Sequence, residues 1–310
     1  MFAMRGPNPR QIEAFRALIL TGGVGAAANL LNISQPAVSR MIRDFQQDLG
    51  LSLFERRGTR LVPTSDALSL YAEVERAFVG LDRIAKTATE LRTRRAGFLR
   101  IAALPALANG FLPRFAGQFA AERPKLDLGV SGLVSHAVVT AVAQGQSDLG
   151  FAESSIEHAA VQAERMPAAP YVAVLPHGHR LARKKRLKPE DFAGEGFVSL
   201  GHSSLSRFRI DQLFAEHGVE RILRIETPLS EIVCSLVASG AGVSLCEAFT
   251  ASEYSTRGIV VRPFEPHIEF EYSALTPAAQ RTSVLARQFI DGFRAHVAAF
   301  LRREPWRERS

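Results

Sequence analysis

The sequence predicts an α+β winged helix-turn-helix domain with a long linker helix, followed by a two-lobed α/β domain. Three observations lead to this fold class. Residues 26–49 have the pattern of two helices joined by a tight turn, and a basic hairpin over 54–64 follows them. Residues 65–94 carry a long helical heptad pattern. From residue 98 onwards short strands alternate with helices, which is typical of α/β domains.

The first predicted helix covers residues 9–20, and glycines in 21–25 end it. A short apolar helix over 26–31 and a turn over 32–34 lead to a second helix that runs to about Leu49. Ser34 is a good N-cap for this helix, Pro36 is tolerated in its first turn, and Gly50 ends it. Apolar residues recur along it at spacings of three and four, which predicts one buried stripe, formed by Ala37, Val38, Met41, Ile42, Phe45 and Leu49.

The other face of this second helix is polar and basic. It carries Gln35, Ser39, Arg40 and Arg43, whose side chains are of the types that hydrogen-bond base edges and phosphates. An ordinary helical hairpin with a merely solvated polar face is the alternative. The hairpin over 54–64 argues against that alternative, because a basic wing would place Arg56, Arg57 and Arg60 against phosphates beside the groove. Helix, turn, helix and wing together favour double-stranded DNA as a partner.

The heptad pattern of residues 65–94 defines an apolar seam at Ala67, Leu70, Val74, Ala77, Leu81, Ile84, Ala88 and Leu91. One helix cannot bury such a seam alone, so we expect it to dimerise, which suits a DNA reader that needs two half-sites. The alternative is a long helix that lies on its own domain, since alanine at three seam positions weakens a coiled coil.

The remaining chain is large enough for two sheets of largely parallel strands with covering helices. The predicted strands are 98–103, 126–131, 148–152, 171–175, 196–200, 222–226, 242–246, 258–261 and 268–275. The predicted helices are 109–122, 134–144, 205–217, 230–239 and 280–301. A cleft between two such sheets is the usual ligand site of this architecture.

Composition and charge agree with a cytoplasmic DNA-binding protein. Of the net charge of +7, residues 1–95 contribute +5 (14 Lys and Arg against 9 Asp and Glu) and the rest +2 (24 against 22). Two cysteines in 310 residues fit a reducing compartment. No apolar run is long enough for a membrane span, and the N-terminus lacks the apolar region of a signal peptide, so we expect no membrane partner.

Nearly the whole chain resembles the LysR-type transcriptional regulators. The matching stretches are 11–15, 26–30, Ser34-Gln35-Pro36-Ala37-Val38-Ser39-Arg40, Leu53-Phe54-Glu55-Arg56, 61–64, 99–102, Gly145-Gln146-Ser147-Asp148-Leu149-Gly150, 179–182 and 238–243. The resemblance implies a DNA-binding domain over 8–64, a dimerising linker helix over 65–96, and an effector domain over 97–305 like a periplasmic binding protein. Its lobes would comprise 97–168 with 273–305, and 169–272.

The same resemblance implies roles for particular residues and partners. By matched position Gln35, Pro36, Ser39 and Arg40 would face the major groove, and Arg56 the DNA backbone. The family also implies a homodimer or homotetramer, a small-molecule effector that alters DNA bending, and contact with RNA polymerase.

Two stretches, 10–17 and 100–110, look similar to regulators of opine catabolism, which respond to arginine-derived opines. The chain also departs from the family pattern. Gly23-Val24-Gly25 stands where members often have a serine and a threonine that cap a helix, so we expect a weaker cap. Leu104-Pro105-Ala106 replaces hydroxyl residues at the first ligand-contacting strand end, so this pocket wall is apolar or binds through backbone N–H groups.

The predicted effector site lies at strand ends and helix starts, and by matched position it draws on Ala106, Leu107, Ser135, Ser203, Ser204 and Glu247. Adjacent hydroxyls and free N–H groups at the start of the 205–217 helix would bind a carboxylate, although the serines could also only cap the helix. Glu153 follows a strand and could pair with a guanidinium or ammonium group, or be a solvated loop residue. With that pairing, the ligand class is an amino-acid-like zwitterion.

We expect no cofactor, no metal and no catalysis. The sequence shows no nucleophile motif, no phosphate loop and no metal-ligand spacing. Cys234 and Cys246 are predicted to be buried small apolar residues, although one branch of the family senses redox state through cysteines. Two other hypotheses stay open here: an enzyme on the same two-lobed fold, and a cytoplasmic solute-binding module that uses the heptad helix only to oligomerise.

Overall fold

The computed structural model describes residues 8–57, 60–93, 97–156, 158–202, 204–279 and 281–303, with the side chains of 57, 60, 76, 79, 82, 83 and 85–93 excepted. The chain divides into two compact units, residues 1–92 and 93–310. Within the described ranges, no helix is both long and apolar enough to cross a membrane.

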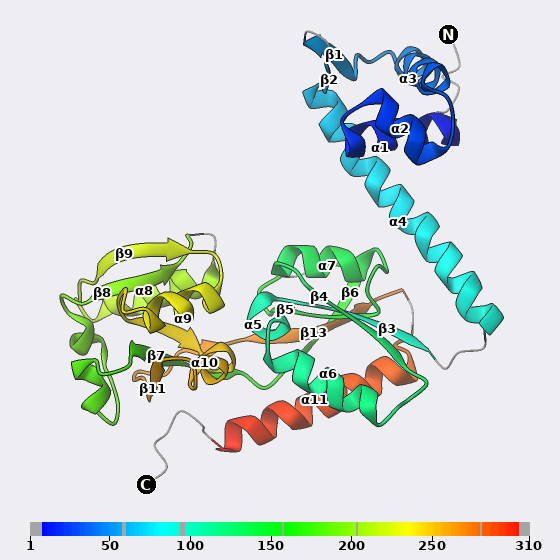
Figure 1. Cartoon of the computed structure of the whole chain (residues 1–310). Coiled ribbons are helices and arrows are strands. Elements are labelled where there is room, and N and C mark those ends of the chain that lie inside the picture. The colour runs from blue at the N-terminus through cyan, green and yellow to red at the C-terminus, as the bar shows by residue number, and fades with distance from the viewer. Residues whose placement is uncertain are drawn as a thin grey trace. The chain divides into compact units, whose positions relative to one another are not determined.

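The first unit begins with three helices whose ends follow from their capping residues (Figure 1). Helix α1 starts after Asn8, whose side chain accepts from the Arg10 N–H, and it ends at Gly22 in the left-handed conformation. Helix α3 starts after Ser34 and ends at Gly50 in the same way. The helices are α1 (Pro9–Thr21), α2 (Val24–Leu31) and α3 (Gln35–Leu49).

A two-stranded antiparallel hairpin and a long helix complete this unit. They are β1 (Phe54–Arg57), β2 (Arg60–Pro63) and α4 (Ser65–Thr93). The core of the unit is built around Phe15, Val38 and Phe45, and α4 contributes Ala67 and Val74 to it. Burial of these apolar side chains stabilises the arrangement in which one face of α3 stays free.

The second unit holds two sheets. The first has the strand order β4-β3-β5-β13-β6, with β3 parallel to β4 and β5, and β13 antiparallel to β5 and β6. Its elements are β3 (Phe98–Ala103), α5 (Pro105–Ala108), α6 (Phe111–Ala121), β4 (Asp127–Gly132), α7 (Ser135–Ala143), β5 (Leu149–Glu153), β6 (Val161–Arg165), β13 (Tyr272–Pro277) and α11 (Val284–Arg303). Helix α7 covers one face of this sheet, and α6 and α11 cover the other (Figure 1).

The second sheet has the order β10-β7-β11, and β12 also pairs with β7. A parallel pair, β8 and β9, joins it through a bridge between Phe197 and Val243. The elements are β7 (Ala169–Pro176), β8 (Gly196–Leu200), α8 (Leu205–Glu216), β9 (Ile222–Thr227), α9 (Ser230–Ala238), β10 (Ser244–Glu247), α10 (Ala248–Tyr254), β11 (Ile259–Pro263), β12 (Glu269–Phe270) and the 3-10 turns Arg180–Arg183 and Pro189–Phe192.

The expectation of largely parallel sheets is wrong for the second sheet. Strand β7 runs antiparallel to β10, β11 and β12. Strand β7 carries the chain out of the first sheet, and the strands that return beside it run the opposite way. The alternation of strands and helices in the sequence does not encode this direction.

Several predicted boundaries also need correction. The predicted helix 109–122 corresponds to α6 alone, and the short helix α5 before it, which begins at Pro105 and is separated from α6 by Gly110, was not predicted. The predicted strand 268–275 divides at Glu271 into β12 and β13, which belong to different sheets. Strand β6 and helix α10 were not predicted, and α2 begins at Val24 rather than Ala26.

Candidate DNA-binding and effector sites

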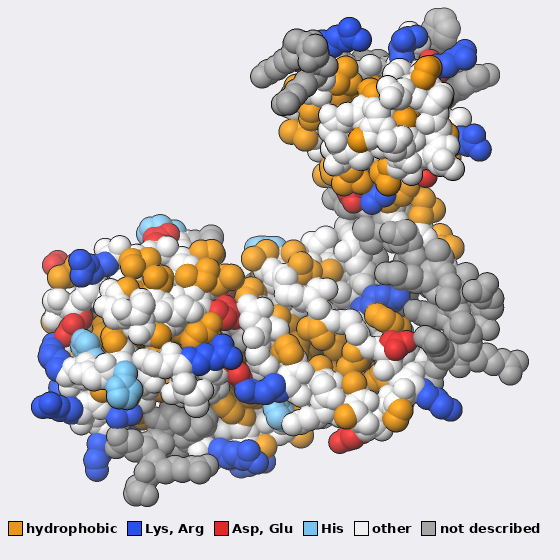
Figure 2. All heavy atoms as spheres, viewed as in Figure 1, with side chains coloured by type: hydrophobic (Ala, Val, Ile, Leu, Met, Phe, Trp, Pro, Cys, Tyr) orange, Lys and Arg blue, Asp and Glu red, His pale blue; other side chains and the backbone are white. Residues whose placement is uncertain are grey.

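The free face of α3 is the first candidate site. Val38, Ile42 and Phe45 on the opposite face are buried in the core of the first unit. The six residues of the free face that the sequence assigns to DNA are all exposed: Ser34, Gln35, Pro36, Ser39, Arg40 and Arg43. Figure 2 shows Lys and Arg side chains along the edge of this unit where Figure 1 places α3. This face therefore presents hydrogen-bonding and basic groups without interruption by an apolar side chain larger than Pro36.

Local contacts fix the start of α3. The Ser34 hydroxyl accepts from the Ala37 N–H at 3.4 Å, which satisfies one of the unpaired donors of the first turn. The weak cap expected for the preceding helix is confirmed, because its N-cap Gly23 offers no side-chain hydrogen bond. Gly25 has a steric role, since a Cβ there would lie 3.2 Å from Nε2 of Gln35. The glycine leaves room for a side chain of the DNA-facing surface.

The hairpin β1–β2 forms the predicted wing, with Arg56 opposite Leu61 and Arg57 opposite Arg60 in the register. The Arg56 side chain is exposed, whereas those of Arg57 and Arg60 lie outside the described residues. Gln46, which the sequence reasoning missed, holds the hairpin against α3. Its Oε1 accepts from the N–H groups of Leu53 at 2.8 Å and Phe54 at 3.1 Å.

Two polar contacts connect the helices of the first unit. The Gln11 amide donates to Asp48 on α3 at 2.9 Å. Arg16 on α1 pairs with Glu75 on α4 at 2.6 Å, and this guanidinium lowers the pKa of the Glu75 carboxyl. Since α1 therefore contacts both α3 and α4, the base of α4 is part of the DNA-binding unit.

The seam of α4 divides into two parts. Ala67 and Val74 are buried in the core of their own unit, and Leu70 packs against them. In contrast, Leu81 is 57% exposed and Ile84 is 67% exposed. The first turns of α4 therefore pack on their own domain, as the alternative predicts, whereas Leu81 and Ile84 are left uncovered in the single chain. The side chains of Ala88 and Leu91 lie outside the described residues.

A small cavity between the two sheets is the second candidate site. Its volume is about 10 Å³, and it is lined by Glu153, Tyr171, Leu205, Ser206, Arg209, Phe270 and Glu271. Glu153 ends β5 of the first sheet, Tyr171 belongs to β7, and Ser206 and Arg209 lie on the first turns of α8. The lining therefore combines strand ends and a helix start from both lobes, which is the place the architecture predicts for a ligand.

Of the predicted effector residues, the structure brings Ser135 and Glu153 together. The Glu153 N–H donates to the Ser135 hydroxyl at 3.3 Å. Burial raises the pKa of the Glu153 carboxyl, while the charges of Arg209 and His136 oppose that shift. Ser204 is the N-cap residue of α8, and its hydroxyl makes no capping hydrogen bond. Ser203 lies outside the described residues.

Of the predicted effector residues that the structure describes, Glu153 alone belongs to the cavity lining. Leu107 is fully buried in the core, and Ala106 packs against the same core. Glu247 is 1% exposed and accepts a hydrogen bond from Ser230 at 3.0 Å and another from Thr250. Burial raises the pKa of Glu247 to about 7. With both hydroxyl donors in the second lobe, the Glu247 carboxyl belongs to the interior of that lobe and not to the cavity between the lobes.

Four polar residues of the cavity escaped the sequence reasoning. Tyr171 donates a hydrogen bond to Ser206, and both side chains are buried. Arg209 pairs with Glu271 at 2.6 Å. Glu271 had a weak signal, because it and Glu269 place two charges at alternate positions within the predicted strand 268–275. The positions of Ser206 and Arg209 within a helix carry no such signal.

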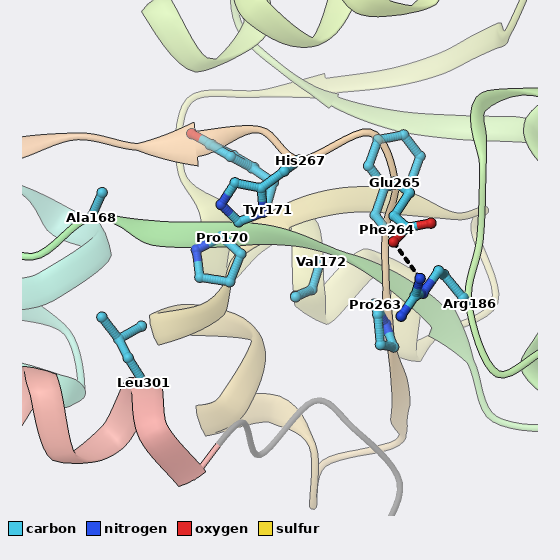
Figure 3. Close-up of a pocket in the computed structure, with 10 residues that line it drawn as sticks. All are labelled: Ala168, Pro170, Tyr171, Val172, Arg186, Pro263, Phe264, Glu265, His267 and Leu301. Carbon is cyan, nitrogen blue, oxygen red and sulfur yellow. Dashed lines mark hydrogen bonds and ion pairs between the residues drawn. The ribbon is translucent and has the colours of Figure 1, made fainter.

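A cavity of about 290 Å³ lies elsewhere, beside β7, the end of β11 and Leu301 of α11 (Figure 3). Pro170, Val172, Pro263 and Leu301 contribute apolar walls, and an ion pair between Arg186 and Glu265 closes one side. Tyr171 contributes to both cavities. None of the predicted effector residues lines this larger one.

The cysteines are both free and buried, as predicted. Cys234 on α9 and Cys246 on β10 place their sulfur atoms 3.8 Å apart, and burial raises the pKa of the Cys246 thiol. Among the described side chains, no three of His, Cys, Asp and Glu are grouped so that they could hold a metal ion.

A winged helix-turn-helix joined to a two-lobed domain with a cavity between its sheets defines a class of protein, the DNA-binding transcriptional regulators that carry a ligand-binding domain. Comparison with known families gives the same answer. Residues 9–68 match the bacterial regulatory helix-turn-helix proteins of the lysR family, and residues 92–298 match the LysR substrate-binding domain. The chain belongs to the LysR family of transcriptional regulators.

Characterised relatives align along nearly the whole chain. The octopine catabolism/uptake operon regulatory protein OccR of Rhizobium meliloti is 41% identical over 289 residues, covering 92% of this chain and 95% of its own. The transcriptional activator protein LysR of Escherichia coli K12 is 39% identical over 286 residues and covers 92% of each chain. These relatives regulate transcription, and this chain is a regulator and not an enzyme.

Solved structures show the same fold. Full-length CbnR, a LysR family regulator solved in complex with its target DNA, has a TM-score of 0.76 at 18% identity and covers 92% of this chain and 98% of its own.

A further sequence relative is the regulatory protein NocR of Agrobacterium fabrum. It is 38% identical over 280 residues and covers 90% of this chain and 93% of its own.

Proposed function

We propose that this regulator binds double-stranded DNA through Ser34, Gln35, Pro36, Ser39, Arg40 and Arg43 of the α3 face, with Arg56 and Arg57 of the wing on the phosphates. The observation that carries the proposal is the division of α3 into a buried stripe and an uninterrupted exposed polar face. The amide and guanidinium groups of this face are those that recognise adenine and guanine edges.

The effector is a small amino-acid-derived carboxylate that also carries a cation, such as arginine or an opine. Two carboxylates, Glu153 and Glu271, line the interlobe cavity and can pair with a guanidinium or ammonium group. The first turn of α8, beside Ser204, offers N–H groups for the ligand carboxylate. OccR, whose name links it to octopine catabolism and uptake, supports the same ligand class.

The regulator acts in the cytoplasm as a homodimer or homotetramer, and effector binding alters its DNA complex and its contact with RNA polymerase. The exposed residues Leu81 and Ile84 support dimerisation through α4, because a partner helix would bury them. We also propose domain bounds at 8–64, 65–96 and 97–305, with the lobes formed by 97–168 and 273–305, and by 169–272.

A footprinting experiment on the promoter DNA next to the gene tests this function. The full-length protein should protect a site with two half-sites one or more helical turns apart, and octopine or arginine should change the protected length or the DNA bend. A simple dicarboxylate without a cation is the control ligand and should change neither. No protection at any promoter fragment would contradict the assignment of the α3 face to DNA.

A further inference from the structure

The interlobe cavity is too small for the ligand that its lining suits. Its volume of about 10 Å³ is that of roughly one water molecule. An amino acid needs several times that space, so at least one side chain of the lining must move before a ligand enters. The side chain most able to move is the one that loses the least buried contact when it leaves the cavity.

Arg209 is that side chain. It extends from α8 to the segment that returns the chain to the first lobe, where its Nη2 pairs with Glu271 at 2.6 Å and its Nη1 donates to the Glu269 carbonyl at 2.7 Å. Its side chain is 31% exposed. In contrast, Tyr171 and Ser206 are buried. A partly exposed arginine can turn towards water and keep its charge hydrated, which the buried residues cannot do.

The charges of the lining explain why a cation is needed at this place. Among the described lining residues, Glu153 and Glu271 are carboxylates and Arg209 is the single cation. The charge of Arg209 lowers the pKa of Glu153, against the effect of burial. If Arg209 moved away and nothing replaced it, two carboxylates would face one small cavity with no cation left in its lining, which is unfavourable.

We propose that Arg209 is an internal stand-in for the cationic group of the effector. Without effector, its guanidinium fills a cation subsite against Glu271, near enough to Glu153 to act on it electrostatically. An effector guanidinium or ammonium group displaces it, so that the cavity enlarges while its charge balance is preserved. This inference deepens the proposed effector class and rests on it.

Arg209 could instead bind the effector itself, and the two roles predict opposite changes in effector affinity when Arg209 is removed. An arginine that binds the effector carboxylate directly would weaken effector binding when it is removed. An arginine that competes with the effector would strengthen it, because the binding-competent state becomes more populated. The contacts of Arg209 favour competition, since its guanidinium already has two oxygen acceptors on the returning segment.

The first experiment measures the thermal stability of the full-length Arg209→Ala protein in millimolar guanidinium chloride, against sodium chloride of equal ionic strength. The variant should fold, because alanine is favourable in a helix and the site is partly exposed. Guanidinium should stabilise Arg209→Ala by occupying the vacated subsite. The matched control, Arg224→Ala, removes an exposed arginine of β9 in the same lobe and should show no such stabilisation.

The second experiment measures arginine binding by calorimetry to the wild type, Arg209→Ala and Arg209→Lys. We expect about tenfold tighter binding to Arg209→Ala, as for a competing state populated about nine-tenths of the time. Arg209→Lys retains a cation and should bind much as the wild type does.

Two results would overturn the inference: loss of arginine binding in Arg209→Ala, or equal guanidinium effects on Arg209→Ala and Arg224→Ala. If guanidinium specifically stabilises Arg209→Ala while arginine binds no form of the protein, the cation subsite stands and the arginine-type effector of the proposed function fails.

Discussion

Along α3, residues that are buried in the core and residues that are exposed for DNA binding alternate at helical spacing. Val38 and Ile42 hold the helix in the core, and Ser39, Arg40 and Arg43 beside them are exposed. Local sequence was sufficient to predict this division, because the apolar and the polar residues each repeat with the period of a helix. Arg209 could not be predicted in the same way. Its partner Glu271 is distant in the chain, and only the fold brings the two together.

Arg40→Ala should weaken specific DNA binding by about 1–3 kcal/mol, because a bidentate contact to a base edge is lost. The side chain is exposed in the free protein, so thermal stability should stay within about 0.5 kcal/mol of the wild type. Fluorescence anisotropy with the footprinted DNA measures the affinity. Lys125→Ala removes an equal charge from the exposed surface of the second unit and serves as the control. If both variants lost the same DNA affinity, Arg40 would contribute only through its charge and not through a base contact.

Glu247 should make stability depend on pH. Burial raises its pKa from 4.5 to about 7, so the folded protein retains a proton that the unfolded chain releases in this interval. Its contribution to stability is therefore full below pH 4.5 and is lost as the pH rises to about 7. Glu247→Gln cannot titrate. The free energy of unfolding of Glu247→Gln minus that of the wild type should therefore be about 2–3 kcal/mol larger at about pH 8 than at about pH 5.

Urea unfolding of both proteins at the two pH values measures this difference. Titration of all other groups cancels when the two proteins are compared at each pH. Parallel pH profiles for wild type and Glu247→Gln would show that this carboxyl has an ordinary pKa.

At the scale of elements, the winged helix-turn-helix was predictable because caps, glycines and apolar spacing all mark the same boundaries. Strand β6 was missed because Val161–Arg165 alternates only weakly and carries two charged residues. Its place depends on pairing with β13, which follows more than a hundred residues later. The direction of β7 relative to β10 and β11 depends in the same way on where the chain crosses between lobes.

The junction between β10 and β8 depends on Gly242. A Cβ at this position would overlap the carbonyl oxygen of Gly196, which accepts from the Val243 N–H at 2.8 Å. Backbone atoms cannot rotate away as a side chain can, so Gly242→Ala should break this bridge and destabilise the second unit by about 3 kcal/mol or more.

Gly240→Ala is the matched control for this prediction. Gly240 also has a positive φ of 85°, but a Cβ there meets nothing within 4 Å. It should destabilise by only about 1 kcal/mol, the effect of the backbone conformation alone. Thermal unfolding of the two variants compares them, and equal losses would rule out the overlap as the cause.

At the scale of the whole molecule, the apolar residues that α4 leaves exposed indicate association. Ile84→Glu should convert the protein to a monomer and lower its affinity for a two-half-site DNA by at least about tenfold, because one dimer then no longer spans both sites. Sedimentation velocity measures the mass. Val284→Glu places the same charge at an exposed apolar residue of α11 and should leave the mass unchanged. An unchanged mass in Ile84→Glu would place the dimer contact elsewhere.

The two lobes of the second unit share one hydrophobic core. The ring of Phe111 on α6 lies 4.7 Å from that of Phe249 on α10, and Phe300 on α11 contacts both. Ion pairing of Arg114 with Glu253 and a 2.9 Å hydrogen bond from Asn109 to Glu231 lie across the same boundary. Such a shared core could not be predicted from local patterns, because each phenylalanine fits its own helix equally well.

For protein engineering, this aromatic contact determines where the regulator can be recombined with a relative to obtain a new ligand response. An exchange of the second lobe alone would separate Phe249 from Phe111 and Phe300, and Glu253 from Arg114. A chimera that keeps these five residues from one parent preserves the boundary between the lobes. The seven residues that line the interlobe cavity can then be varied within it.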